Sequence, residues 1–298
     1  MRSVNKQRRA DLLLVLITAF WGMSYFLTDL CMTGMTPMGL NAFRFLIGFA
    51  VLAAVFWKKM RPISRQTLKY GVLVGLALSA VYVFYAYGIL YTSITNAGFI
   101  CALPVVTTPV IEFIVTRKRP NKKLFFALVL CTVGMGMLTL NEQFKPALGD
   151  ILCLGVAVFY GVDLVVTDRA VHKSEVDPLQ MGVIQLGVVG VVTLILTLVL
   201  EKPTLPSTPE VWAAALFLAI FCTGIAFVVQ TVQQQYTTAS HVGLIFTLEP
   251  VFSAIVAFVL AGERLRPMGY AGAVLMMVSL VLMELDLGAV KRKMRKKS

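Results

Sequence analysis

The chain has 298 residues, of which 58% are hydrophobic and only 14% are charged, and its mean hydropathy is +0.82. A soluble domain carries about a quarter charged residues because its surface faces water, so this composition excludes a soluble protein and predicts an all-α polytopic membrane protein. The net charge of +12 does not indicate nucleic-acid binding, because the basic residues cluster at the termini and in short connections.

The chain opens with a basic stretch followed by an apolar run, "MRSVNKQRRADLLLVLITAFWG". This order is similar to a secretory signal peptide, but the run exceeds the usual apolar core and no A-x-A-like cleavage site follows it. We therefore expect residues 1–10 to be a basic cytoplasmic N-terminus and the run to be a retained first span.

Ten apolar segments of about 18–25 residues follow one another, each long enough for a helix to cross the hydrocarbon core. The expected spans are Asp11–Met32, Met38–Trp57, Leu68–Tyr91, Ile94–Thr116, Leu124–Leu140, Leu148–Thr167, Leu179–Leu200, Val211–Gln230, Ser240–Ala261 and Met268–Glu284. With the N-terminus inside, cytoplasmic segments hold 22 of the 27 Lys and Arg residues and outside loops hold four. This asymmetry predicts that both termini, including the basic tail at 287–298, are cytoplasmic.

The two halves of the chain resemble each other. "AFWGMSYFLTDL" from Ala19 aligns with "VFYGVDLVVTDR" from Val158, which superposes Gly22 on Gly161. "YTSITNAGFICALP" from Tyr91 aligns with "YTTASHVGLIFTLEP" from Tyr236. Five spans in each half is an odd number, so the pattern predicts two inverted five-helix repeats, 11–140 and 148–286, around a central cavity.

Several motifs resemble the EamA family of the drug/metabolite transporter superfamily. The stretch "LEPVFSAIVAFVLAGERL" places LEP about a dozen residues before GERL, and "FWGMSYF" occurs in the first span. The resemblance covers nearly the whole chain and implies a ten-span carrier of small organic solutes. One departure is Lys118, which stands where the first repeat of the family often has Glu.

Ionisable residues within membrane spans are candidates for function because burying them in lipid is costly. Asp163 lies deep in the sixth span, with Tyr160 and Thr167 on the same helix face. A carboxylate, an aromatic ring and a hydroxyl together suit an amine-bearing solute, so we expect Asp163 to contact substrate. The alternative is a neutral Asp163 that bonds a neighbouring helix.

Glu249 and Pro250 interrupt the ninth span near its centre, opposite Pro104 in the fourth. Proline lacks an N–H and crowds the carbonyl four residues earlier, so both positions are expected hinges. Glu249 is interpreted first as framework and second as a proton-coupling group, with His241 nearby.

The remaining candidates line the expected cavity or gate it. Asp29 and Arg44 are predicted to form a gating ion pair across a short loop, and Glu112 an exposed gate or ion pair. The substrate-binding candidates, with Asp163 and Tyr160, are Trp21, Tyr25, Tyr82, Asn96, Thr107 and Gln230. For each aromatic residue taken singly, core packing is an equal alternative.

The resemblance implies a secondary transporter that exports amino acids or related metabolites by alternating access, and the residues around Asp163 favour amine-bearing solutes. Uptake or antiport is the alternative within transport. An intramembrane enzyme is disfavoured because neither H-E-x-x-H nor G-x-S-x-G occurs, and a receptor is disfavoured because it would not need an inverted repeat. The five scattered cysteines form no C-x-x-C pair, so neither cofactor nor metal is expected. The expected partners are a small-molecule substrate, the lipid of a bacterial inner-membrane-type plasma membrane and protons as coupling ion. The expected state is a monomer or weak homodimer.

Overall fold

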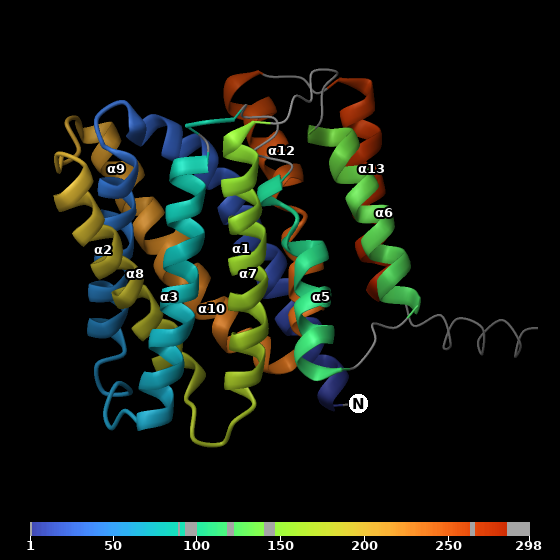
Figure 1. Cartoon of the computed structure of the whole chain (residues 1–298), viewed down its shortest axis with the longest axis horizontal. Helices are drawn as coiled ribbons and strands as arrows, with labels where there is room; N and C mark the ends of the chain where they lie inside the picture. The colour runs from blue at the N-terminus through green and yellow to red at the C-terminus, as the bar shows by residue number, and fades with distance from the viewer. Residues whose placement is uncertain are drawn as a thin grey trace, which may run out of the picture.

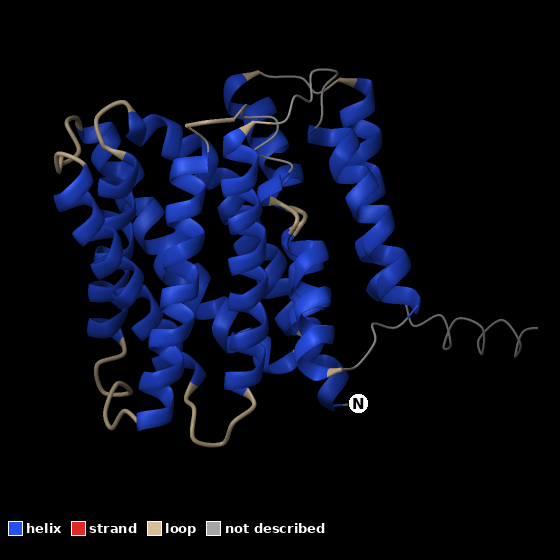
Figure 2. Cartoon of the chain, viewed as in Figure 1, coloured by secondary structure: helices blue, strands red, loops and turns tan. Residues whose placement is uncertain are grey.

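A computed structural model describes residues 2–88, 90–92, 100–117, 122–139, 147–262 and 266–284. Within these ranges the secondary structure is helical and no strand occurs (Figure 2). The helices of the first half are α1 (Arg2–Met32), α2 (Pro37–Val55), α3 (Arg65–Gly88), α5 (Pro104–Thr116) and α6 (Lys122–Thr139). Those of the second half are α7 (Leu148–Val171), α8 (Pro178–Leu200), α9 (Pro209–Phe217), the π-helix η1 (Leu218–Ile225), α10 (Ala226–Gln233), the short η2 (Gln234–Tyr236), α11 (Ala239–Phe246), α12 (Glu249–Ala261) and α13 (Pro267–Glu284).

Seven helical stretches within the described ranges are long and apolar enough to cross a membrane, and two shorter apolar helices, α5 and α13, accompany them. The membrane class is therefore confirmed, whereas the count of ten spans stays a prediction. The expected fourth span, Ile94–Thr116, falls partly outside the described residues, and α5 begins only at Pro104.

Local signals set where several helices begin. A proline occupies the first turn of α2, α5, α8, α9 and α12, where its missing N–H leaves no hydrogen bond unmade. Asp177 caps α8 by accepting from the Leu179 and Gln180 amides at 2.8 and 3.0 Å. The Glu201 carboxylate, directly after the neighbouring helix α8, accepts from the Met38 amide at 3.1 Å and so caps α2.

The two halves interleave rather than lie apart. In Figure 1, α2 and α3 lie beside α7 and α8, while α6 and α13 pair at one side. One large apolar core joins residues of α1, α2, α3, α7, α8 and the α9–α11 region. A smaller cluster joins α6 and α13 to α5, α11 and α12.

The aligned glycines of the repeat make crossed contacts between the halves. A Cβ on Gly22 of α1 would lie 2.8 Å from the Ser253 amide nitrogen of α12. A Cβ on Gly161 of α7 would lie 3.2 Å from the Thr108 amide nitrogen of α5. Each half therefore packs its first helix directly against the backbone of the helix that follows the break in the other half.

Candidate functional site

The ninth span is interrupted immediately before Glu249. α11 ends at Phe246, and the Leu248 amide then bonds the Ile245 carbonyl at 3.1 Å in a tight turn. Pro250 has no N–H for the carbonyl of Phe246, so a new helix starts here. Glu249 lies in the first turn of α12, where the positive end of the helix dipole favours a carboxylate.

The fourth span contains a matching turn before Pro104. The Leu103 amide bonds the Ile100 carbonyl at 3.1 Å, and α5 then begins at Pro104. Both expected interruptions are therefore present as turns between helical segments, and their role as hinges stays a prediction.

Four tyrosines converge on the Glu249 carboxylate from α1, α3 and α7. The Tyr25 hydroxyl donates a hydrogen bond to it, and Tyr82, Tyr85 and Tyr160 lie within its electrostatic range. Tyr25 is 45% exposed, and Glu249 and the other three tyrosines are half-buried. These side chains therefore border accessible space and provide a carboxylate surrounded by aromatic rings. Packing of α1 against α12 through Gly22 brings Tyr25, one turn further along α1, to Glu249.

Arg44 of α2 adds a positive charge to the same region. It is 6% exposed, its Nε donates to the Thr223 hydroxyl at 2.6 Å, and its guanidinium lies 5.7 Å from the Tyr82 ring centre. Arg44 and Glu249 interact electrostatically without forming an ion pair in the described part of the chain. Such separated opposite charges, with tyrosine rings around them, suit a solute that carries both an ammonium and a carboxylate group.

The structure does not bring Asp29 to Arg44. Asp29 is exposed on α1, and no ion pair joins the two residues, both of which lie in the described ranges. Arg44 instead points to Thr223, 179 positions further along the chain.

Thr223 belongs to the π-helical segment η1, which the sequence patterns did not indicate. The wider turn of a π-helix changes which backbone groups pair, and the Cys222 carbonyl accepts from the Trp21 indole Nε1 at 2.8 Å. Gly48 lets α2 reach this segment, since a Cβ there would lie 2.8 Å from the Ala219 carbonyl oxygen. The segment is thus held by contacts from α1 and α2.

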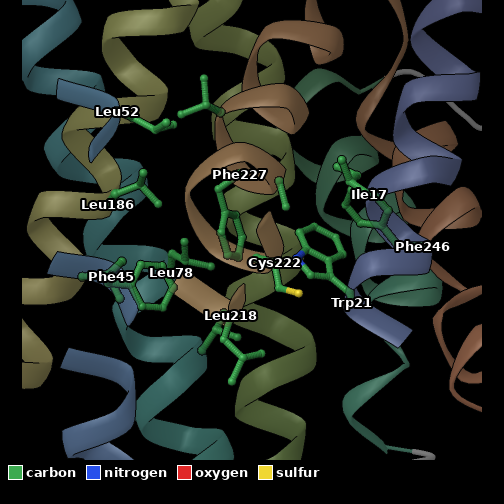
Figure 3. Close-up of a cluster of buried hydrophobic side chains, with 14 of the residues drawn as sticks. Ile17, Trp21, Phe45, Leu52, Leu78, Leu186, Leu218, Cys222, Phe227 and Phe246 are labelled. Atoms are coloured by element: carbon green, nitrogen blue, oxygen red, sulfur yellow. Dashed lines mark hydrogen bonds between the residues drawn. The ribbon is translucent and has the colours of Figure 1, made fainter. Parts of the chain in front are cut away.

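Trp21 packs beneath the tyrosine group rather than bordering accessible space. It is 5% exposed and its ring lies 4.7 Å from Phe246 and 5.2 Å from Phe227 (Figure 3). Phe246 in turn stacks on Tyr160 at 6.2 Å. Trp21 therefore supports the last residue of α11 and, through it, a tyrosine of the site.

Asp163 belongs to a second polar group, which lies deeper in the bundle than Glu249. It is 1% exposed and receives a side-chain hydrogen bond from Gln230 of α10. Gln234, one turn further, donates from Nε2 to the Leu164 carbonyl of α7 at 2.5 Å. Thr167, one turn beyond Asp163, is also buried. The structure thus brings Asp163 and Gln230 together, but both are buried, and their role in substrate binding stays a prediction.

A third polar group closes the end of the bundle at which α1 begins. The Ser240 hydroxyl donates to the Glu112 carboxylate, and His241 Nε2 lies 3.9 Å from Asp11 Oδ1, with His241 and Asp11 both buried. Asp11 had no expected role, although an acid directly after a basic stretch at the start of a span is an available signal.

Two other candidates have simpler outcomes. Thr107 is half-buried and donates to the Ala157 carbonyl at 2.6 Å, which ties α5 to α7. Asn96 lies outside the described residues.

The groove between α5 and α6 offers no charge to a polar solute. Its lining is apolar apart from the Thr132 hydroxyl, and that hydroxyl donates to its own helix at the Leu128 carbonyl, 2.8 Å away. Among the surfaces described here, the tyrosine group around Glu249 is therefore the best candidate for solute binding.

Comparison with known proteins gives consistent matches along the chain. The EamA-like transporter family matches residues 8–140 and 147–285. An uncharacterized transporter of Archaeoglobus fulgidus is 28% identical over 280 residues, covering 94% of this chain and 87% of the relative. The uncharacterized transporter YwfM of Bacillus subtilis is 25% identical, covering 91% of this chain and 92% of the relative. A solved crystal structure shares the fold with a TM-score of 0.81 at 17% identity, covering 92% of this chain and 97% of that one.

Proposed function

The chain belongs to the EamA-like transporter family, and we propose that it exports amino acids or related amine-bearing metabolites across the plasma membrane by alternating access. The relatives from Archaeoglobus fulgidus and Bacillus subtilis are named as uncharacterized transporters, so the support for a substrate class comes from the site itself.

The observation that carries the proposal is that the opposite charges of Glu249 and Arg44 interact without forming an ion pair, with tyrosine side chains close to both. A substrate ammonium group would bind the Glu249 carboxylate, assisted by the faces of the surrounding rings. The Arg44 guanidinium, which is buried beside the Tyr82 ring, would attract the substrate carboxylate, and its planar fork would suit two oxygens if substrate binding exposed it. We assign substrate contact to Glu249 rather than Asp163 because Glu249 borders accessible space and Asp163 does not.

Alternating access is supported by an unequal closure of the two ends. The end where α1 begins is held by the Ser240–Glu112 bond and the Asp11–His241 pair. Tyr25, the most exposed of the four tyrosines, lies toward the opposite end of α1. With the N-terminus inside, as the basic residues predict, this arrangement corresponds to an outward-accessible cavity above a closed cytoplasmic gate.

The binding half of the proposal is tested with matched solutes on purified protein. An amino acid, its decarboxylated amine and its deaminated acid are compared for the rise in Tm that each produces, since ligands of the folded state raise apparent stability. We expect the amino acid to stabilise most. Glu249→Gln should remove the response to the amine, and Arg44→Gln the response to the acid. Exposed Glu175→Gln and Arg65→Gln serve as controls. No amino acid response across the proteinogenic set would contradict the proposed substrate class.

The direction of transport is tested in cells that overproduce the protein. We expect the stabilising amino acid to accumulate faster in the medium, and Glu249→Gln to abolish the increase. Faster accumulation inside the cells would support uptake instead.

A further inference from the structure

Asp163 is a buried carboxylate with no basic partner in the part of the chain that the structure describes. Among the described residues the recorded ion pair is Asp11–His241, and Asp163 receives only the Gln230 amide. Its Oδ1 has no hydrogen-bond partner at all. A charge buried in this way is strongly destabilising unless something compensates it.

Three further buried oxygens near Asp163 lack partners. They are Thr167 Oγ1, Gln230 Oε1 and Gln234 Oε1, and each residue is no more than 1% exposed. Buried polar atoms are nearly always bonded, so four unpaired oxygens in one group need an explanation.

Thr167 differs from the other buried threonines on these helices. Thr193, Thr197 and Thr231 each donate to the carbonyl four residues earlier in their own helix, at 2.7, 2.7 and 2.8 Å. Thr167 makes no such bond to the Asp163 carbonyl. Its hydroxyl oxygen is therefore not engaged by its own helix.

The four residues lie on two helical segments that contact each other, α7 and the continuous stretch formed by α10 and η2. Asp163 and Thr167 are one turn apart on α7, and Gln230 and Gln234 are one turn apart on α10 and η2. The Gln230 side chain bonds the Asp163 carboxylate, and the Gln234 side chain bonds the Leu164 carbonyl. Helix carbonyls point toward the C-terminus, so the Leu164 carbonyl points along α7 in the direction of Thr167.

We propose that Asp163, Thr167, Gln230 and Gln234 form a Na⁺ site that couples a cation gradient to transport. Carboxylate, amide and hydroxyl oxygens are the donors that hard cations prefer. A proton would pair Asp163 with one acceptor and leave the other oxygens unbonded, whereas one cation engages all four. The described residues hold no group of three or more His, Cys, Asp or Glu, so the donor set does not suit a transition metal.

Tyr160 links this site to the substrate cavity. It lies one turn before Asp163 on α7 and within electrostatic range of both Asp163 and Glu249. A cation bound at Asp163 would change the charge that Tyr160 experiences and so affect the ring that faces the solute. This coupling rests on the proposed transport function, whereas ion binding itself does not.

The site is tested with Na⁺ alone, so its outcome is independent of the substrate. Purified protein is unfolded by heat in NaCl or choline chloride mixtures of constant ionic strength and pH. We expect the wild-type Tm to rise with the logarithm of the Na⁺ concentration. Asp163→Asn and Thr167→Val should remove this rise, and Thr193→Val, which alters a hydroxyl bonded to its own helix, should retain it. Thr167→Val should fold at least as well as wild type in choline chloride, because it removes an unpaired buried hydroxyl.

Three results would overturn the proposal: equal Tm values in NaCl and choline chloride, a Na⁺ response that survives in both site variants, or a Tm that depends on pH but not on Na⁺. The last result would identify a proton as the ligand. A clear Na⁺ response without any amino acid response would contradict the proposed substrate and leave the ion site standing.

Discussion

Replacing Thr223 by valine removes one hydrogen-bond acceptor and almost no volume. In the wild type the Thr223 hydroxyl accepts from Arg44 Nε at 2.6 Å, and Thr223 itself is fully buried. Arg44 is 6% exposed, so water cannot readily replace the lost oxygen. The variant therefore leaves a charged donor unpaired inside the bundle.

The size of the effect follows from the charge and the burial. A hydrogen bond to a charged group contributes about 1.5–3 kcal/mol to the free energy of unfolding. Loss of the partner of a buried charged group costs an amount near the upper end of this range. We expect Thr223→Val to lower the free energy of unfolding by about 2–3 kcal/mol. That change corresponds to a roughly 30- to 150-fold shift in the unfolding equilibrium.

The assay is reversible unfolding of purified protein, with Thr197→Val as the matched control. Thr197 is equally buried, but its hydroxyl donates to the Thr193 carbonyl of its own helix at 2.7 Å, so no charged group loses its partner. We expect the control to cost less than about 1 kcal/mol. Equal destabilisation by the two variants would refute the view that Arg44 depends on the hydroxyl of the π-helical segment.

Three other predictions concern packing and gating. Trp21→Phe should destabilise the protein by about 1–3 kcal/mol in the same assay, because the Cys222 carbonyl loses its indole donor at 2.8 Å; an unchanged stability would contradict this role. Gly134→Ala should cost about 1–3 kcal/mol, since its Cβ would lie 2.7 Å from the Gly272 carbonyl oxygen. Gly243→Ala, whose Cβ would meet nothing nearer than 3.6 Å, should be neutral or stabilising, and the opposite order would refute the packing argument. Ser240→Ala should speed hydrogen exchange of the α11 amides by releasing Glu112, whereas unchanged exchange would exclude this bond as part of the gate.

Much of the scaffold was predictable because membrane helices leave strong local signals. Apolar length and helix-breaking prolines located most helices and both interruptions, and the repeat aligned Gly22 with Gly161. The number of spans was less secure, because the apolar parts of α5 and α13 are shorter than the seven stretches long enough to cross a membrane, and part of the fourth span lies outside the described residues.

The contacts of the site could not be predicted, because they depend on how each helix is rotated about its own axis. The spacing of polar residues does not determine this rotation when most faces of a helix are apolar. Asp29 and Arg44 are close along the chain, yet Arg44 bonds Thr223 on the neighbouring segment η1 and not Asp29. The π-helical segment has no residue signature of its own and is held by Trp21 and the close approach of Gly48. Depth in the span correctly singled out Asp163 as buried, but it did not distinguish a group that borders accessible space from one that is enclosed.

The crossed glycine contacts explain why the two interruptions must be considered together. Gly22 of the first half sits on α12, which begins with Glu249, and Gly161 of the second half sits on α5, which begins with Pro104. Any rotation of α1 against α12 therefore changes the distance between Tyr25 and Glu249, and the matching rotation of α7 against α5 moves Tyr160 and Asp163. Because each half packs against the interrupted helix of the other, a movement of one half relative to the other would displace both polar groups. Glu249, the proposed partner of the substrate ammonium, and Asp163 of the proposed cation site thus lie on helices that each pack against the other half, and coupling between them requires such an arrangement.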